Sequence, residues 1–86
     1  MTTKVTPNSN GTDVESDDHI YDGHVRVERS GKTRALVIDV FRSSLRDPEA
    51  AHVESESFPL SQDGTVAATG FLEGYGFRVT IANPRR

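Results

Sequence analysis

Cysteine and tryptophan are absent from this chain, and aromatic residues make up only 7% of its 86 residues. Without cysteine, disulfides, iron–sulfur clusters, thiolate zinc sites and cysteine nucleophiles are excluded. Long apolar runs are absent as well, since none approaches the ~18 residues of a membrane span. The N-terminus has neither a basic start nor an apolar segment. We therefore expect no signal peptide, no membrane partner and a cytoplasmic location.

Hydrophobic residues are scarce in the first 18 positions, where only Met1, Val5 and Val14 are apolar. Four acidic residues and one lysine give this segment a net charge of −3, which equals the net charge of the whole chain. So little apolar area cannot offset the entropy cost of ordering the backbone, about 1–2 kcal/mol per residue. The composition therefore predicts a disordered acidic tail over residues 1–18 and a single β-rich domain over residues 19–86.

Alternating polar and apolar residues follow this tail and predict β-strands. Residues 21–29 have one apolar face, whereas residues 34–41 (RALVIDVF) are apolar on both faces and should form the most central strand. A four-residue loop at 30–33 keeps the apolar faces of the two strands together and sets Val27 opposite Leu36. The sequence thus predicts one long hairpin with a defined register.

The later elements are a short helix near 47–52, an edge strand at 53–58, a hairpin turn at 61–64, and strands at 65–72 and 75–82. The helix start rests on Asp47 as N-cap and Pro48 at the first helical position. Together these elements predict a mainly β protein, with α+β as the alternative. The expected architecture is an antiparallel meander of about five short strands, either an open sheet or a small barrel.

The expected core collects the apolar positions of the alternating strands: Val25, Val27, Leu36, Ile38, Val40, Phe71, Tyr75, Phe77, Val79 and Ile81. Because the strand at 34–41 is apolar on both faces, something must cover its second face. The short helix region with Leu45, closure into a barrel and a second subunit are the three alternatives. The last of these makes a homodimer a hypothesis to test.

Two motifs suggest ligands but lack the context that the chemistry needs. Gly31-Lys32-Thr33 matches the end of a phosphate-binding loop, yet Arg26 stands where that motif requires glycine, and a strand follows it in place of a helix. Residues 17–24 contain three carboxylates and two imidazoles, but their spacing fits no metal-binding loop. We therefore expect neither a cofactor nor a metal site.

Catalytic residues are equally hard to assemble. Ser43, Ser44, His52 and Asp39 supply the residue types of a hydrolytic triad, but no Gly-x-Ser-x-Gly elbow occurs. Asp39 lies in the middle of a strand, and its pKa would be raised if it were covered. With no catalytic residues assigned, the chain is not expected to be an enzyme.

The function expected from these observations is that of a small non-enzymatic binding module. It would act by protein–protein interaction, as a regulator, inhibitor or accessory protein of bacterial or phage type, and an exposed strand edge is the expected docking surface. The alternative is a nucleic-acid-binding β domain that uses the basic hairpin at 26–34. The candidate macromolecule-binding residues are Arg26, Arg29, Lys32 and Arg34.

Overall fold

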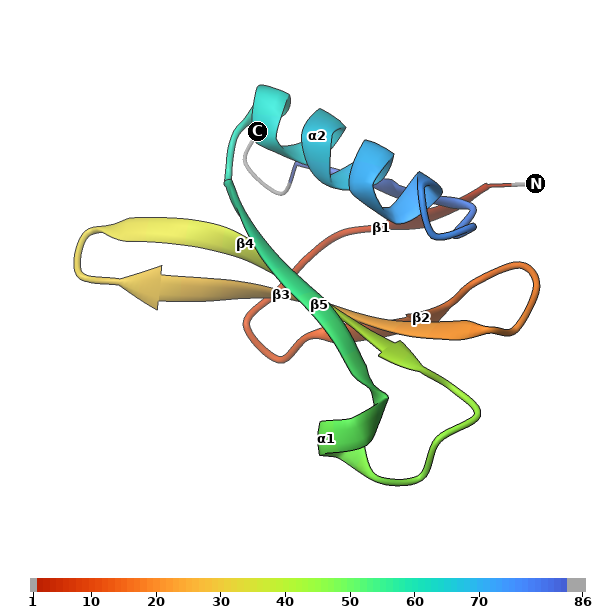
Figure 1. Cartoon of the computed structure of the whole chain (residues 1–86). Helices are drawn as coiled ribbons and strands as arrows, with labels where there is room; N and C mark the ends of the chain where they lie inside the picture. Colours follow the sequence, from red (N-terminus) through yellow and green to blue (C-terminus); the bar gives the residue numbers. More distant parts are fainter. Residues whose placement is uncertain (1, 84–86) are drawn as a thin grey trace.

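A computed structural model describes residues 2–83, so that Met1 and residues 84–86 lie outside the described part of the chain. The elements are β1 (Thr3–Val5), β2 (Thr12–Glu15), β3 (Tyr21–Ser30), β4 (Thr33–Arg42), α1 (Pro48–Ala51), β5 (His52–Pro59), α2 (Gln62–Glu73) and β6 (Val79–Ile81). Four strands form an antiparallel sheet in the order β2-β3-β4-β5, and β1 pairs in parallel with β6 (Figure 1). The predicted mainly β, antiparallel architecture is confirmed. Within the described residues the sheet is open and not a closed barrel.

The β3–β4 hairpin has the register that side-chain parity predicts, but its loop is shorter than the four residues expected, because Ser30 and Thr33 also pair. Val25 lies opposite Ile38, and Val27 lies opposite Leu36. The turn contains Gly31 at a φ of 62°, in the left-handed region that glycine adopts without steric cost. The alternation of polar and apolar residues along the two strands is therefore enough to predict which residues lie opposite each other.

The short helix and the edge strand after it are also confirmed. The side chain of Asp47 accepts a hydrogen bond from the Glu49 N–H at 3.0 Å, and Pro48 occupies the first turn, where its missing N–H costs nothing. α1 spans a single turn and leads directly into β5. β5 pairs with β4 on one side only and forms one edge of the sheet.

The predicted turn at 61–64 and strand at 65–72 are wrong, because this segment forms helix α2. Ser61 is its N-cap, and its hydroxyl accepts a hydrogen bond from the Gly64 N–H at 3.1 Å. A β-carbon on Gly64 would lie 1.7 Å from the carbonyl oxygen of Pro59, so glycine is required where the helix begins against β5. The residues read as a hairpin turn are thus the first turn of a helix.

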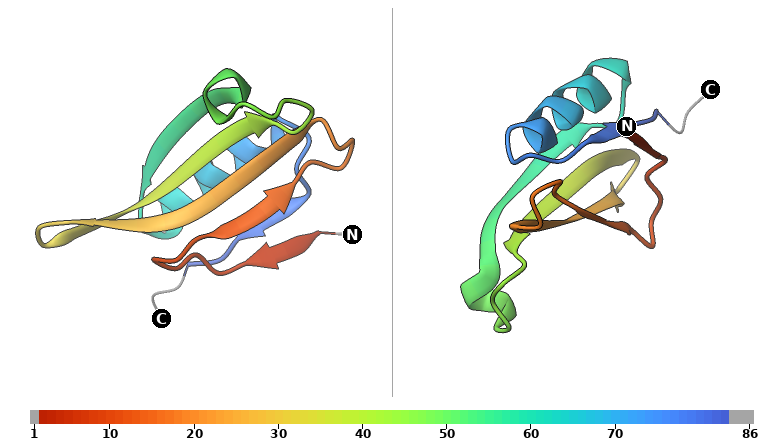
Figure 2. Two further views of the ribbon diagram at one scale, coloured as in Figure 1. Left: turned by 90° about the horizontal axis from the view of Figure 1, so that it is seen from below. Right: turned by 90° about the vertical axis from the view of Figure 1, so that its right-hand side faces the viewer.

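Helix α2 covers one face of the sheet, as Figure 2 shows from two directions. Its buried positions, which recur at helical spacing, are Gly64, Thr65, Ala68 and Leu72. Ala68 and Leu72 have no exposed area and pack into the same core as the apolar face of the β3–β4 hairpin. This burial stabilises the helix more than its propensity does, because Thr69 and Gly70 are poor helix formers.

The first 18 residues also differ from the sequence-based expectation. They contain strands β1 and β2, which pair with β6 and β3, and the side chain of Val5 is only 5% exposed. The composition still explains why disorder was predicted, since few other apolar residues are present. Pairing with the distant strand β6 and with the next strand, β3, compensates for this, because the backbone groups of residues 3–5 and 12–15 take part in strand ladders.

The C-terminal strand is shorter than the 75–82 segment predicted. Residues 74–77 close the end of α2, where the Phe77 N–H donates to the Leu72 carbonyl oxygen at 3.1 Å. The alternation is nevertheless correct at Phe77, Val79 and Ile81, whose side chains are all buried. β6 pairs in parallel with β1, so the chain is not a simple meander.

The core lies between the sheet and the layer formed by α2, β1 and β6. Seven of the ten predicted core residues are buried, whereas Val27, Phe71 and Tyr75 are partly buried against them. The opposite face of the sheet is half-exposed, and Leu45 leaves 47% of its area exposed and does not cover it. On this second face, Phe41 packs edge-on against His52. A second subunit on this face stays a hypothesis.

Candidate functional site

The end of the β3–β4 hairpin projects beyond its neighbours in the sheet. β2 pairs with β3 only between residues 22 and 25, and β5 pairs with β4 only between residues 35 and 41. Residues 28–34 therefore extend past both flanking strands, and every one of them is exposed (Figure 2, left). A two-stranded ribbon of this kind offers its side chains to a partner from several directions.

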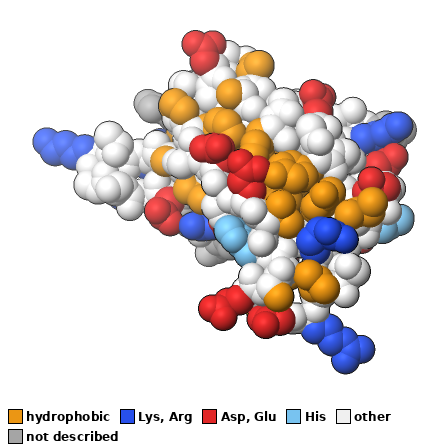
Figure 3. Space-filling model, in the orientation of Figure 1, with side chains coloured by type: hydrophobic (Ala, Val, Ile, Leu, Met, Phe, Trp, Pro, Cys, Tyr) orange, Lys and Arg blue, Asp and Glu red, His pale blue; other side chains and the backbone are white. Residues whose placement is uncertain are grey.

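Three of the four predicted binding residues lie on this projecting end. Arg29 and Arg34 face each other across the strands, and Lys32 lies in the turn; Figure 3 shows a basic side chain at the far tip. None of the three forms an ion pair with an acidic residue in the described part of the chain. Arg26 does not join them. Its guanidinium lies on the other face of the hairpin, where Glu28 and Asp39 neutralise it.

A cleft of about 440 Å³ lies beneath this projecting end. Arg29 and Arg34 line it together with the apolar side chains of Val27 and Leu60, and residues 7–9 form its opposite wall. Sequence reasoning missed this cleft because the wall belongs to the segment predicted to be disordered. The turn-forming residues around Asn8 indicate a turn in the sequence, but they do not predict which strand the turn packs against.

The wall of the cleft is held by hydrogen bonds that Asn8 accepts. Its side-chain oxygen accepts from the backbone N–H groups of Asn10 and Gly11, at 3.0 Å and 2.8 Å. Its carbonyl oxygen accepts from the Val27 N–H at 2.9 Å. The turn is thus closed on itself and pinned to β3, so this side of the cleft is built in advance of any ligand.

A polar network runs across the open face of the sheet. Arg26 donates to the Asp39 carboxylate, Ser55 donates to the same carboxylate at 2.6 Å, and His52 lies 2.7 Å from the Ser55 hydroxyl. Burial alone would raise the pKa of Asp39, but the hydrogen bonds from Ser55 and Arg26 outweigh it and lower that pKa. The raised pKa expected for a covered Asp39 is therefore wrong.

This network does not have the order of a catalytic triad. A serine nucleophile requires a histidine base between the hydroxyl and the carboxylate. Here the Ser55 hydroxyl lies between His52 and Asp39 and donates its proton to the carboxylate. Ser43, considered from the sequence, donates to the carbonyl oxygen of His19 on another part of the surface. The arrangement positions side chains but does not activate a nucleophile.

The carboxylates and imidazoles near residues 17–24 are divided into separate pairs. His24 lies 2.7 Å from Asp13, and His19 lies 3.2 Å from Glu15. Asp18 accepts from the Ser16 hydroxyl, which together with the Ile20 N–H lowers the pKa of Asp18. Within residues 2–83 no three potential ligands gather closely enough to hold a metal ion.

The Gly31-Lys32-Thr33 motif forms a hairpin turn. The strands pair up to Ser30 and Thr33, and the Thr33 hydroxyl donates to the Ser30 carbonyl oxygen at 2.8 Å. A phosphate-binding loop instead directs backbone N–H groups at the ligand from the start of a helix. The motif therefore does not build a phosphate loop here.

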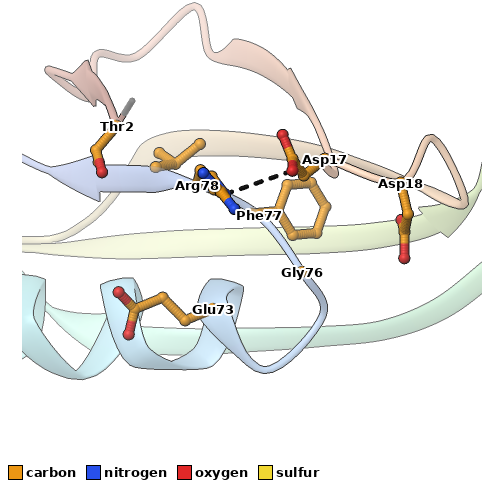
Figure 4. A pocket seen from close by; sticks show the side chains of 8 residues that line it. Thr2, Asp17, Asp18, Glu73, Gly76, Phe77 and Arg78 are labelled. Carbon is orange, nitrogen blue, oxygen red and sulfur yellow. Dashed lines mark ion pairs between the residues drawn. The ribbon is translucent and has the colours of Figure 1, made fainter.

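The hollow beside β6 is larger and has an acidic lining (Figure 4). Its volume is about 680 Å³, and its charged side chains are Asp17, Asp18, Glu73 and Arg78. Arg78 is paired with Asp17 at 3.4 Å, and the Asp18 carboxylate is engaged by its own turn. The one cation that lines this hollow, Arg78, is thus already neutralised, in contrast to Arg29 and Arg34, which line the cleft beneath the hairpin.

The β5 edge carries a different polar surface. Figure 3 shows acidic side chains beside hydrophobic ones in the middle of the view, where β5 passes in front of β3 and β4 in Figure 1. Glu54 accepts a hydrogen bond from the Tyr75 hydroxyl, which raises the pKa of Tyr75 to about 12. Glu56, two residues along the strand, is exposed and has no ion-pair partner in the described chain.

Comparison with known proteins does not supply a family for this chain. No protein-family model, no curated protein and no solved structure matches it. Within residues 2–83, no helix has the length and apolar character needed to span a membrane.

Proposed function

We propose that this protein is a small non-enzymatic module that binds another protein by accepting a strand along the free edge of β5. The observation that carries the proposal is the edge itself. β5 is eight residues long, most of them are exposed, and among the described strands it pairs with β4 alone. An extended partner segment could continue the sheet by hydrogen bonding to its outward backbone groups.

The alternation of hydrogen bonds identifies which groups point outward. The Val27 N–H donates to Asn8, away from β4, so Val27 and Leu36 form a non-hydrogen-bonded pair within the hairpin. Leu36 must then exchange its backbone bonds with its β5 partner, Phe58, and Ile38 does the same with Glu56. The intervening residues of β5 direct their N–H and C=O groups to solvent; they are Ser55 and Ser57.

The charges along β5 favour a different protein over a second copy of this chain. An antiparallel pairing of two β5 strands centred on Ser55 would place Glu54 opposite Glu56 twice. Like charges directly opposite each other destabilise a strand pair. We infer that the partner strand carries neutral or basic residues at these positions.

The non-enzymatic part of the proposal is supported by the polar network on the open sheet face. Its hydroxyl, Ser55, already donates to Asp39, and its arginine already binds two carboxylates. No buried side-chain nitrogen or oxygen within residues 2–83 lacks a partner. Buried polar groups whose hydrogen bonds are satisfied in this way are typical of a structural network.

Proline at an outward position tests strand addition directly. Ser57→Pro removes an N–H that faces solvent and leaves the β4 ladder intact. Tagged wild type and Ser57→Ala should retain the same protein from a host lysate, whereas Ser57→Pro should lose it. Mass spectrometry identifies the retained chain. Equal retention by Ser57→Pro would exclude the β5 edge as the docking surface.

Nucleic-acid binding is a second candidate, and it rests on the projecting ribbon. The major groove of DNA admits a two-stranded β-ribbon, and this one has three basic side chains that form no ion pair in the described part of the chain. Reversal of Arg29, Lys32 and Arg34 to Glu should abolish binding of an oligonucleotide at low salt and remove its salt dependence. If the wild type shows no micromolar binding at low salt, this candidate is excluded.

A further inference from the structure

The cleft beneath the hairpin brings together two arginines, Arg29 and Arg34, that form no ion pair with an acidic residue among residues 2–83. Arg29 and Arg34 form a cross-strand pair two residues beyond the pair Val27 and Leu36. Because hydrogen-bonded and non-hydrogen-bonded pairs alternate, Arg29 and Arg34 also form a non-hydrogen-bonded pair, the type in which side chains are closest. Two guanidinium groups in this position repel each other. An anion placed between them would relieve that repulsion.

The charge and geometry of the pair favour an anion with two negative charges. Each guanidinium presents a planar fork that binds an oxyanion through two parallel hydrogen bonds. A single carboxylate can neutralise one of the two arginines. A phosphate monoester carries a charge of about −1.5 to −2 near neutral pH and three acceptor oxygens, so it can engage both.

The floor of the cleft adds an apolar contact. Val27 and Leu60 line it next to the arginines, and Leu60 is 8% exposed. Pro7 contributes a third apolar side chain from the opposite wall, which Asn8 holds against β3. A bare phosphate ion would leave this surface in water, whereas an apolar substituent would cover it.

We propose that this cleft binds a phosphate monoester whose organic part is apolar, with the phosphate between Arg29 and Arg34 and the apolar part against Val27 and Leu60. Such a phosphate monoester could be either a free organic phosphate or a phosphorylated side chain of another protein. The site is separate from the β5 edge. The proposal for this cleft can therefore be tested independently of the proposal that β5 accepts a partner strand.

Phenyl phosphate is a suitable probe, because it combines a dianionic group with one apolar ring. Its affinity should be measured by NMR titration of the full chain. Arg29→Gln and Arg34→Gln should each weaken binding by about tenfold or more, through loss of charge-assisted hydrogen bonds. Lys32→Gln is the matched control, because Lys32 has the same charge on the same hairpin but does not line the cleft. It should change the affinity by less than about twofold.

The same titrations contain the results that would overturn the site. Equal losses from Lys32→Gln and Arg34→Gln would mean that the probe responds only to the overall charge of the ribbon. If inorganic phosphate binds as tightly as phenyl phosphate, the apolar side chains of Val27 and Leu60 do not contribute to binding. Amide shifts in the wild type that avoid residues 7–9 and 27 would place the probe elsewhere. Circular dichroism of each variant checks that it is folded.

A second arm distinguishes the two sources of the ligand. A short peptide with a central phosphotyrosine should bind more tightly than phenyl phosphate if the natural ligand is a modified protein. Equal affinities would assign the site to a free organic phosphate. Binding of either probe should be unchanged in Ser57→Pro, so that failure of the proposed strand addition and failure of this site give different results.

Discussion

The two halves of the β3–β4 hairpin have the same backbone pairing but opposite surroundings. In the half nearest α2, the side chains of Val25, Leu36, Ile38 and Val40 have no exposed area. In the projecting half, residues 28–34 are all exposed, and two arginines face each other. The ladder continues through both halves without a change of register. Pairing alone therefore does not distinguish a segment that contributes to the core from one that is exposed to solvent.

The difference arises from what covers each half. α2 and β6 supply apolar side chains to the first half, so its burial provides the main free energy of folding. The second half extends past the flanking strands β2 and β5 and makes little contribution to the core. Like charges can lie opposite each other there without disturbing the core, as Arg29 and Arg34 do. Substitutions in the two halves should consequently have very different effects.

The largest effect is expected where the covering layer meets the buried half. The Phe77 side chain is 1% exposed, and its ring packs over Gly23 of β3. Phe77→Ala should reduce the free energy of unfolding by about 3–5 kcal/mol. A domain this small has only ~5 kcal/mol to lose, so the variant should be largely unfolded in a urea titration at room temperature.

Arg78→Ala is the matched control for that variant. The side chain of Arg78 is 63% exposed and its ion pair with Asp17 lies in solvent, where such pairs contribute little. The free energy of unfolding should change by less than ~0.5 kcal/mol. Similar losses from Phe77→Ala and Arg78→Ala would contradict the assignment of the core to one face of this segment.

The next prediction compares two residues on the same face of β4, one in the buried half of the hairpin and one in the projecting half. Leu36 has no exposed area, and Leu36→Ala should cost about 2–5 kcal/mol through lost burial and the cavity left behind. Arg34 lies two residues away on the same face, beyond the core. Arg34→Gln should raise the stability by about 0.2–1 kcal/mol, because it removes a like-charged cross-strand pair. A destabilised Arg34→Gln would show that the projecting half contributes to folding.

A smaller difference is expected between neighbouring residues of β5. The Glu56 N–H points into the sheet, and Glu56→Pro should cost about 1–3 kcal/mol by leaving the carbonyl group of β4 without its donor. Ser57→Pro should cost less than ~1 kcal/mol, since its N–H faces solvent. Thermal unfolding of both variants measures the difference. If Ser57→Pro were the more damaging change, the N–H of Ser57 and not that of Glu56 would point towards β4.

The smallest effect concerns the open face of the sheet and its acid dependence. Because the folded-state pKa of Asp39 lies below 3.8, its ionised form stabilises the fold above about pH 4, and this contribution is lost as the pH falls through the lowered value. Asp39→Asn removes the titrating group. Urea midpoints measured from about pH 6 to about pH 2 should therefore fall less steeply in the variant than in wild type. Equal slopes would contradict the role of Ser55 and Arg26.

Part of the candidate site could be predicted from the sequence. The pairing of Arg29 with Arg34 follows from the same parity that places Val27 opposite Leu36. The same parity also predicts that Arg26 lies apart from Arg29 and Arg34, because residues 26 and 29 are on opposite faces of the hairpin. Asp39, the partner of Arg26, shares the face of Arg26 in the hairpin register. The cleft could not be predicted, since its wall comes from a segment distant in the sequence.

By itself the sequence determined the local features of this protein: the hairpin register, the Asp47 cap, the edge strand and the buried alternation of Phe77, Val79 and Ile81. These depend on neighbouring residues and on side-chain parity, which short stretches contain in full. Only the tertiary structure decided that residues 62–73 form a helix and that residues 3–5 pair with 79–81. Both choices depend on the apolar face of the β3–β4 hairpin, because a helix and a parallel strand pair gain their stability there by burying side chains that their own sequences cannot cover.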